Sequence, residues 1–211
     1  MNRTIKLLIL SDILTLTGFG LIAPILAIFI KDNLIGGTIF TAGIASTIFL
    51  ITKSSIQLPF SRYVDKHDDK VKWLIVGTFV VSLVPWIYIF SDHIYLIYVA
   101  EIIHGIGSGI VYPTWLGLWS LNLDRKQESF EWSFYSTCIS IGTAITAAIG
   151  AAMAEFVGFT ITFLVVWAMS LVGFGILFFL ERKERKKRKI TPEIKHYPNR
   201  IKATNGRNPK F

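Results

Sequence analysis

Long apolar stretches separated by short polar connections run through this chain from residue 5 to residue 180. Six of them cover 5–30, 39–60, 72–90, 94–120, 132–155 and 159–180. An α-helix needs about 20 apolar residues to cross a bilayer, whereas strands and soluble core helices have shorter apolar runs. The pattern therefore predicts an all-α membrane protein with six transmembrane helices.

Lysine and arginine residues are distributed unevenly among the connections. One side of the predicted membrane has Arg3, Lys6, Arg62, Lys66, Lys70, Lys72, Arg125 and Lys126, whereas the other side has Lys31 alone. Basic residues stay in the cytoplasm, so both termini are predicted to be cytoplasmic and the protein to lie in the cell membrane. The even number of spans agrees with this orientation.

The composition agrees with a membrane protein, because 52% of the 211 residues are hydrophobic and 17% are charged. The net charge of +8 comes largely from the segment 181–211, which includes the basic run 185–189. Directly after a cytoplasmic helix end, such a run contacts anionic lipid head groups, so we expect a lipid bilayer and no nucleic acid as partner. Its polar composition from residue 191 onward predicts a disordered tail.

An acidic residue, two glycines and a proline recur with one spacing in the first and fourth spans. The two sets are Asp12, Gly18, Gly20 and Pro24, and, 89 residues later, Glu101, Gly107, Gly109 and Pro113. The two spans cross the membrane in opposite directions. The pattern therefore predicts an inverted repeat of three plus three helices, with repeats at 1–90 and 91–180 and the tail at 181–211.

The glycines and prolines of this pattern predict helices that bend and approach their neighbours closely. A proline removes one backbone hydrogen bond, and glycines let two helix backbones meet. In the fourth span, a packing face formed by Gly105, Gly107 and Gly109 is an equally good interpretation.

The two acids need compensation, because a charged group deep in a membrane costs at least about 2.5 kcal/mol. Lys53 lies seven residues before the predicted end of the second span, at about the depth of Asp12. We therefore predict that Asp12 and Lys53 form an ion pair or share an aqueous pocket. His104, one helical turn after Glu101, is placed to share a proton with it. The alternative is that these pairs only fix helix register.

Aromatic residues on the fourth span offer a surface for an apolar or cationic ligand. They are Tyr112, Trp115 and Trp119. A lipid-facing or interfacial position explains them equally well.

The connection after the second span reads Ser61-Arg62-Tyr63-Val64-Asp65-Lys66-His67-Asp68-Asp69-Lys70. It resembles the signature Gly-x-x-x-Asp-Arg-x-Gly-Arg-Lys of the major facilitator superfamily. Asp65, Lys66 and Lys70 match in type and spacing, and Ser61 replaces the first glycine. The segment from Gly18 to Pro24 is similar to the first helix of the superfamily's drug–proton antiporter branch.

Two further spans extend this resemblance to all six helices in order. Gly142, Thr146 and Gly150 in the fifth span resemble the antiporter motif Gly-x3-Gly-Pro-x-x-Gly-Gly, with its central Gly-Pro replaced. In the fourth span, Glu101 stands where the family usually has an arginine. The resemblance implies transport of a small solute by alternating access. Because the arginine and the proline are missing, proton coupling, another coupling and uncoupled transport all stay open.

The family's usual chain has twelve spans, so six spans correspond to half of it. The resemblance implies a dimer with a second copy or another six-helix half, in which Lys53, Asp65 and the small residues of the fifth span lie at the seam. Asp65 would then cap the start of the partner's fifth helix. A fragment, a split half, and a member that no longer transports are the alternatives.

An enzymatic function is not expected from this sequence. Ser108, between two glycines, suggests an intramembrane serine protease, but that mechanism needs a histidine on the sixth helix, and 159–180 contain none. The sequence has no Walker loop, dinucleotide fingerprint or metal-ligand cluster. We therefore predict no cofactor and no metal.

Overall fold

The computed structural model describes residues 3–124 and 126–190, and in these residues the chain is helical without a strand. The helices are α1 (Arg3–Ile22), α2 (Leu26–Asn33), α3 (Ile39–Lys66), α4 (Lys70–Ser82), α5 (Val84–Ile89), α6 (Ile94–Asn122), α7 (Glu128–Phe156) and α8 (Phe159–Ile190). Six segments among them are long and apolar enough to cross a membrane, which confirms the predicted number of spans. The tail predicted at 181–211 begins inside α8, which continues to Ile190, and its part from residue 191 onward lies outside the described residues.

Prolines divide two of the predicted spans. Pro24 lies in the turn between α1 and α2, so the first span is two helices rather than the single helix predicted at 5–30. Pro85 stands at the start of α5 and separates it from α4. Proline lacks the donor for the preceding helical turn and clashes with it. Pro113, by contrast, lies inside α6, which continues past it without a break.

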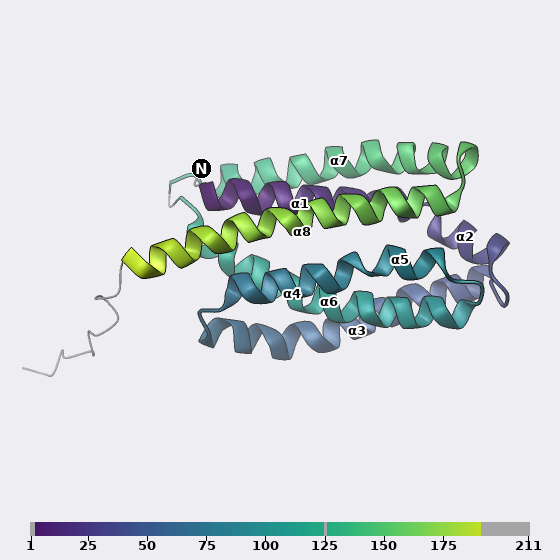
Figure 1. Ribbon diagram of the computed structural model, residues 1–211, viewed down its shortest axis with the longest axis horizontal. Coiled ribbons are helices and arrows are strands. Elements are labelled where there is room, and N and C mark those ends of the chain that lie inside the picture. The colour runs from purple at the N-terminus through teal and green to yellow at the C-terminus, as the bar shows by residue number, and fades with distance from the viewer. Residues whose placement is uncertain (1–2, 125, 191–211) are drawn as a thin grey trace, which may run out of the picture.

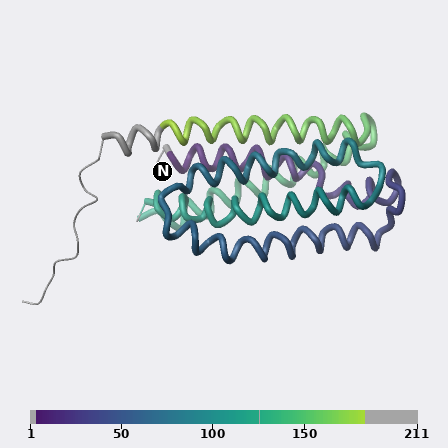
Figure 2. The backbone as a smooth tube through the Cα atoms, turned by 60° about the horizontal axis from the view of Figure 1, so that its bottom comes forward, coloured from purple at the N-terminus to yellow at the C-terminus, as the bar shows by residue number. Residues whose placement is uncertain are grey.

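The long helices form two groups, which Figure 1 shows one above the other. The first group consists of α1, α7 and α8, because α1 packs on both of the others. The second group consists of α3, α4, α5 and α6, with α6 packed on α3 and α4. Figure 2 shows from another direction that the helices of both groups run along one long axis. The start of α1 and the end of α8 lie at the same end of the molecule (Figure 1).

Two apolar clusters hold the groups together, one toward each end. The first cluster joins α1, α2 and α8 to α5 and α6 through Leu21, Phe29, Val84, Ile97 and Phe163. The second cluster contains Ile5, Leu8, Leu74, Trp119 and Leu177, from α1, α4, α6 and α8. Burial of these side chains in both clusters leaves the middle of the molecule for polar groups.

Candidate functional site

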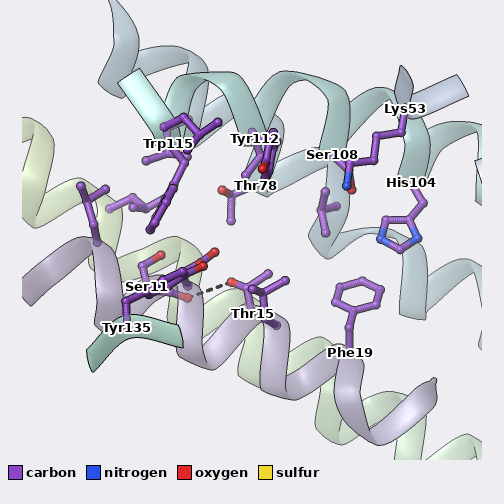
Figure 3. A pocket seen from close by; sticks show the side chains of 18 of the residues that line it. Ser11, Thr15, Phe19, Lys53, Thr78, His104, Ser108, Tyr112, Trp115 and Tyr135 are labelled. Atoms are coloured by element: carbon purple, nitrogen blue, oxygen red, sulfur yellow. Dashed lines mark hydrogen bonds between the residues drawn. The ribbon is translucent and has the colours of Figure 1, made fainter. Parts of the chain in front are cut away.

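A cavity of about 450 Å³ lies between the two helix groups. The first group lines it with Leu8, Ser11, Asp12, Thr15, Leu16, Phe19, Trp132, Tyr135 and Leu177, and the second with Phe49, Lys53, Leu74, Thr78, Val81, His104, Ser108, Val111, Tyr112, Trp115 and Leu116. Figure 3 shows side chains of α1 and α6 facing each other across it. Its volume is in the range of sites that hold small molecules.

Asp12 faces this cavity from α1, where it is half-buried. The hydroxyl group of Tyr135, on α7, donates a hydrogen bond to Asp12 Oδ2. A phenol donating to a carboxylate is among the stronger hydrogen bonds in proteins. The two residues are 123 positions apart, so this bond ties the first helix of the chain to α7.

Lys53 reaches the same cavity from the opposite wall (Figure 3). Its Nζ atom lies 5.2 Å from the ring centre of Tyr112 and 5.8 Å from that of Phe49. Among the described residues it forms no ion pair with a carboxylate, so the direct pair with Asp12 is not made. The second form of that prediction, a pocket shared by Asp12 and Lys53, is what the structure contains.

The reason for the missing ion pair is the length of α3. The sequence predicted that this helix ends near residue 60, whereas it continues to Lys66. Lys53 is therefore thirteen residues before the end of the helix, and about 20 Å from it at 1.5 Å per residue. Lys53 thus lies near the middle of its span, where its side chain cannot reach either end.

The position of Lys53 has an energetic consequence. A lysine at the centre of a membrane helix costs about 2.5–3.5 kcal/mol, and a cation–π contact returns about 0.5–2 kcal/mol. The two aromatic rings therefore do not fully offset the cost of the ammonium group. Water or an anionic group in the cavity has to supply the rest.

Glu101 is buried, with 3% of its surface exposed, and does not line the cavity. The Tyr88 hydroxyl donates to its Oε1 atom at 2.6 Å. Nδ1 of His104 lies 3.4 Å from Glu101 Oε2. The His104 ring lines the cavity, and its centre lies 4.7 Å from the ring centre of Phe19 and 4.3 Å from that of Phe49. His104 thus separates the buried acid from the cavity.

Two of the three aromatic residues predicted on the fourth span line the cavity. These are Tyr112 and Trp115. Trp119 is fully buried and does not line it; its ring stacks on Trp115 at 4.8 Å and contacts Trp132 at 5.3 Å. The Trp119 ring therefore supports the wall of the cavity from behind.

The glycines of the repeated pattern face neighbouring helices rather than the cavity. A side chain at Gly18 would meet Val166 and Met169 of α8, and one at Gly107 would meet Gly77 and Val80 of α4. A side chain at Gly20 would meet Thr143 and Thr146 of α7, and one at Gly109 would meet Lys53 and Ile56 of α3. A side chain at Gly105 would meet Phe49 and Thr52 of α3. The contacts of α1 with α8 thus recur between α6 and α4, because each residue of the first set has its counterpart 89 positions away in the second set. Those of α1 with α7 recur between α6 and α3 at an offset of 89 or 90.

The small residues of α7 also pack inside the chain. Gly142 faces Thr17, and Gly150 faces the backbone of Leu21, both on α1. The seam with another half, predicted at the small residues of the fifth span, stays a prediction, because these two glycines pack on α1 while most of α7 is exposed. Close approach of two backbones in this chain explains these glycines.

The connection after α3 forms a helix end. Lys70 donates from Nζ to the carbonyl oxygens of Val64 at 2.6 Å and His67 at 3.0 Å, which satisfies groups at the end of α3. The Ser61 hydroxyl donates to its own helix, to Leu58 O at 2.8 Å. The remaining motif residues, Arg62, Asp65 and Lys66, are exposed.

Sequence reasoning missed the two tyrosines that hold the acids, Tyr88 and Tyr135. Each lies within a few residues of the end of its predicted span, and a tyrosine there is a weak signal for such a role, because it also serves as an interfacial or packing residue. Ser108 and His104 lie on one helix and both line the cavity, and no nucleophile–base hydrogen bond is formed between them. No group of three or more His, Cys, Asp or Glu side chains among residues 3–124 and 126–190 is arranged to hold a metal ion.

Six apolar helices around a cavity that has Asp12 and Lys53 in its walls define a multi-pass membrane protein with a solute-sized internal site. Residues 8–207 match the family described as Major Facilitator Superfamily. The chain belongs to this superfamily.

Relatives and solved structures agree with this assignment. The quinolone resistance protein NorA of Staphylococcus aureus (strain N315) is 23% identical over 199 residues, which are 92% of this chain and 50% of NorA. An uncharacterized MFS-type transporter of Methanocaldococcus jannaschii is 24% identical over 164 residues, 77% of this chain and 42% of the relative. This chain therefore spans about half the length of these relatives.

The fold resembles solved transporter structures. The POT family transporter PepTSo has a TM-score of 0.76 at 16% identity, over 87% of this chain and 38% of PepTSo. An auto inhibited POT family peptide transporter has a TM-score of 0.73 at 16% identity, over 86% of this chain and 37% of that one. At this identity the likeness describes the arrangement of helices.

Proposed function

We propose that this protein moves a small solute across the cell membrane by alternating access, as one six-helix half of a major facilitator transporter. The observation that carries the proposal is the cavity between the two helix groups, which has Asp12 on one wall and Lys53 on the other. A polar cavity in the middle of a membrane helix bundle is where transporters of repeated architecture bind their substrates. The kinship with quinolone resistance proteins supports export of an aromatic solute.

The repeated contacts of the glycines support an inverted repeat of three plus three helices. In that arrangement α1 and α6 are equivalent and line the cavity of each half, and the two six-helix bundles rock so that the cavity opens to one face at a time. The basic connections lie at the end of the molecule where α1 starts and α8 ends (Figure 1), which supports cytoplasmic termini.

Asp12, Glu101 and His104 are proposed to carry the coupling proton or cation. Asp12 meets the solute directly, because it lines the cavity. Glu101 exchanges its proton through His104, whose ring stands between the acid and the cavity. Lys53 belongs to the solute site rather than to an ion pair.

Two six-helix halves are proposed to form the working transporter. The half-length match to NorA supports this, and so does the low burial of α3 and α7, the second and fifth spans. The exposed Asp65, at the end of α3, is then available to cap a helix of the other half. Mass measurement in nanodiscs tests the assembly, and a strict monomer that transports would exclude it.

Transport is tested with the purified chain in liposomes, with a fluorescent quinolone as the probe and an imposed pH gradient. We expect flux above that of empty liposomes, and loss of flux in Asp12→Asn and Glu101→Gln. Asp32→Asn is the matched control, because that acid is exposed on α2 and pairs with Lys31 at 3.9 Å.

Other outcomes would contradict parts of the proposal. Flux that persists in both Asp12→Asn and Glu101→Gln would remove these acids from the mechanism. Flux absent from the wild type, but restored by a co-expressed second half, would show that the chain needs a different partner. A wild type without flux under either condition would favour a family member that does not transport.

A further inference from the structure

The two charged side chains of the cavity come from opposite walls. Asp12 belongs to α1 in the first helix group, and Lys53 belongs to α3 in the second. Figure 3 shows Lys53 at one end of the cavity and Tyr135, which donates to Asp12, toward the other end on the α1 side. The cavity thus has a negative and a positive pole, each on a different helix group.

Neither charge is neutralised by a charged group of the described chain. The hydroxyl of Tyr135 satisfies Oδ2 of Asp12, and no described group donates to Oδ1. The Lys53 ammonium group lies over the rings of Tyr112 and Phe49, and no described carboxylate forms an ion pair with it. Both side chains therefore retain hydrogen-bonding capacity toward the cavity.

The spacing between the poles is that of a small molecule. The Tyr135 ring lies 4.7 Å from that of Trp115, and Lys53 Nζ lies 5.2 Å from the ring of Tyr112. Trp115 and Tyr112 are three residues apart on α6, which is about 4.5 Å along the helix. The charges are thus too far apart for an ion pair and close enough for one solute of one or two rings to reach both.

The surface between the poles is largely apolar and aromatic, with the hydroxyl groups of Thr15, Thr78 and Ser108 among the rings. Phe19, Phe49, Tyr112, Trp115 and Trp132 line it. Flat rings stack on such walls, whereas a small inorganic ion would leave them in contact with water. An inorganic ion is therefore a poor occupant of the whole cavity.

We propose that this cavity binds a zwitterionic aromatic solute, with its carboxylate on Lys53, its ammonium group on Asp12 and its ring between the aromatic walls. Such a solute compensates both charges at once and bridges the two helix groups. The inference rests on the proposed function only in taking this cavity as the solute site, and it concerns binding rather than flux.

Three matched probes separate the contributions of the two poles. They are 4-(aminomethyl)benzoate, which is a zwitterion, its methyl ester, which keeps only the positive charge, and 4-methylbenzoate, which keeps only the negative charge. A second set with a biphenyl in place of the benzene ring covers the longer spacing. Affinities are measured by calorimetry on the full chain in nanodiscs.

In the wild type we expect the zwitterion to bind at least about tenfold more tightly than either singly charged probe of the better-fitting set. Lys53→Met should remove the advantage over the ester, because the carboxylate of the zwitterion loses its partner. Asp12→Asn should remove the advantage over the methylbenzoate. Lys31→Met, which changes an exposed lysine of α2, should leave all ratios as they are.

The comparison is made between probes in one protein sample, so a lower folded fraction in a variant does not change the ratio. Equal affinities of the zwitterion and the ester in the wild type would overturn the proposal, and so would an unchanged ratio in Lys53→Met or no binding in either probe set. Charge-selective binding without flux, both alone and with a co-expressed second half, would instead refute the transport function and leave this inference standing.

Discussion

Replacing Tyr88 with phenylalanine removes one buried oxygen atom near the end of α5. The hydroxyl group of Tyr88 donates to Glu101 Oε1 at 2.6 Å, and the two side chains are 1% and 3% exposed. After the substitution, the acid keeps only His104, whose Nδ1 atom lies 3.4 Å from the other oxygen. Water cannot replace the lost donor without a rearrangement of the buried side chains around it.

The size of the effect follows from this geometry. A hydrogen bond to a charged group contributes about 1.5–3 kcal/mol, and a buried acceptor left without its donor costs a similar amount. For a chain of this size, each kcal/mol changes the midpoint of thermal unfolding by about 2–4 °C. We therefore expect Tyr88→Phe to lower the unfolding midpoint by about 3–12 °C.

The assay is thermal unfolding in detergent, followed by near-ultraviolet circular dichroism. Tyr95→Phe is the matched control, because Tyr95 is 69% exposed and should show no change. In a Glu101→Gln background the acceptor is uncharged, so Tyr88→Phe should cost less than half as much. Equal midpoints for Tyr88→Phe and Tyr95→Phe would show that this hydrogen bond does not stabilise the fold.

Further predictions concern helix packing and helix ends. Gly150→Val should lower the yield of folded protein, because the valine side chain would meet the backbone of Leu21 and overpacking costs about 1–3 kcal/mol. Ala148→Val, on the exposed side of α7, is the control and should leave the yield unchanged. Size-exclusion profiles of the two variants measure the yield of folded protein. Lys70→Met should destabilise the protein by about 1 kcal/mol, since two carbonyl oxygens at the end of α3 lose their donor, whereas the exposed Lys66→Met should be neutral in chemical unfolding.

The arrangement of apolar residues was sufficient to predict the six spans, because bilayer thickness fixes the length of every helix that crosses it. The ends of helices were less accurate. The polar segment 61–66 continues α3 past its predicted end because Lys70 closes the helix further along. Pro24 and Pro113 occupy the same position in the repeated pattern of acid and glycines, yet only Pro24 interrupts its helix.

The site was predictable only as far as single helices determine it. Glu101 and His104 are one turn apart on α6, so their proximity follows from helix geometry. Asp12 and Lys53 were placed by depth alone, and a six-residue error in the end of α3 changed their relation from an ion pair to two poles of one cavity. The bond from Tyr135 to Asp12 depends on tertiary packing, which no local pattern encodes.

The division into two helix groups has a consequence for biogenesis. The second group is one continuous stretch of chain, whereas the first unites α1 with α7 and α8, which follow that stretch in the sequence. Between Asp12 and Tyr135 the ribosome adds 123 residues, which takes about 6–25 s at about 5–20 residues per second. Throughout that interval α1 resides in the membrane before its carboxylate has the tyrosine that will hold it. The helices α3 to α6 can pack during the same time, so α1 is held in place only after the helices that follow it have formed.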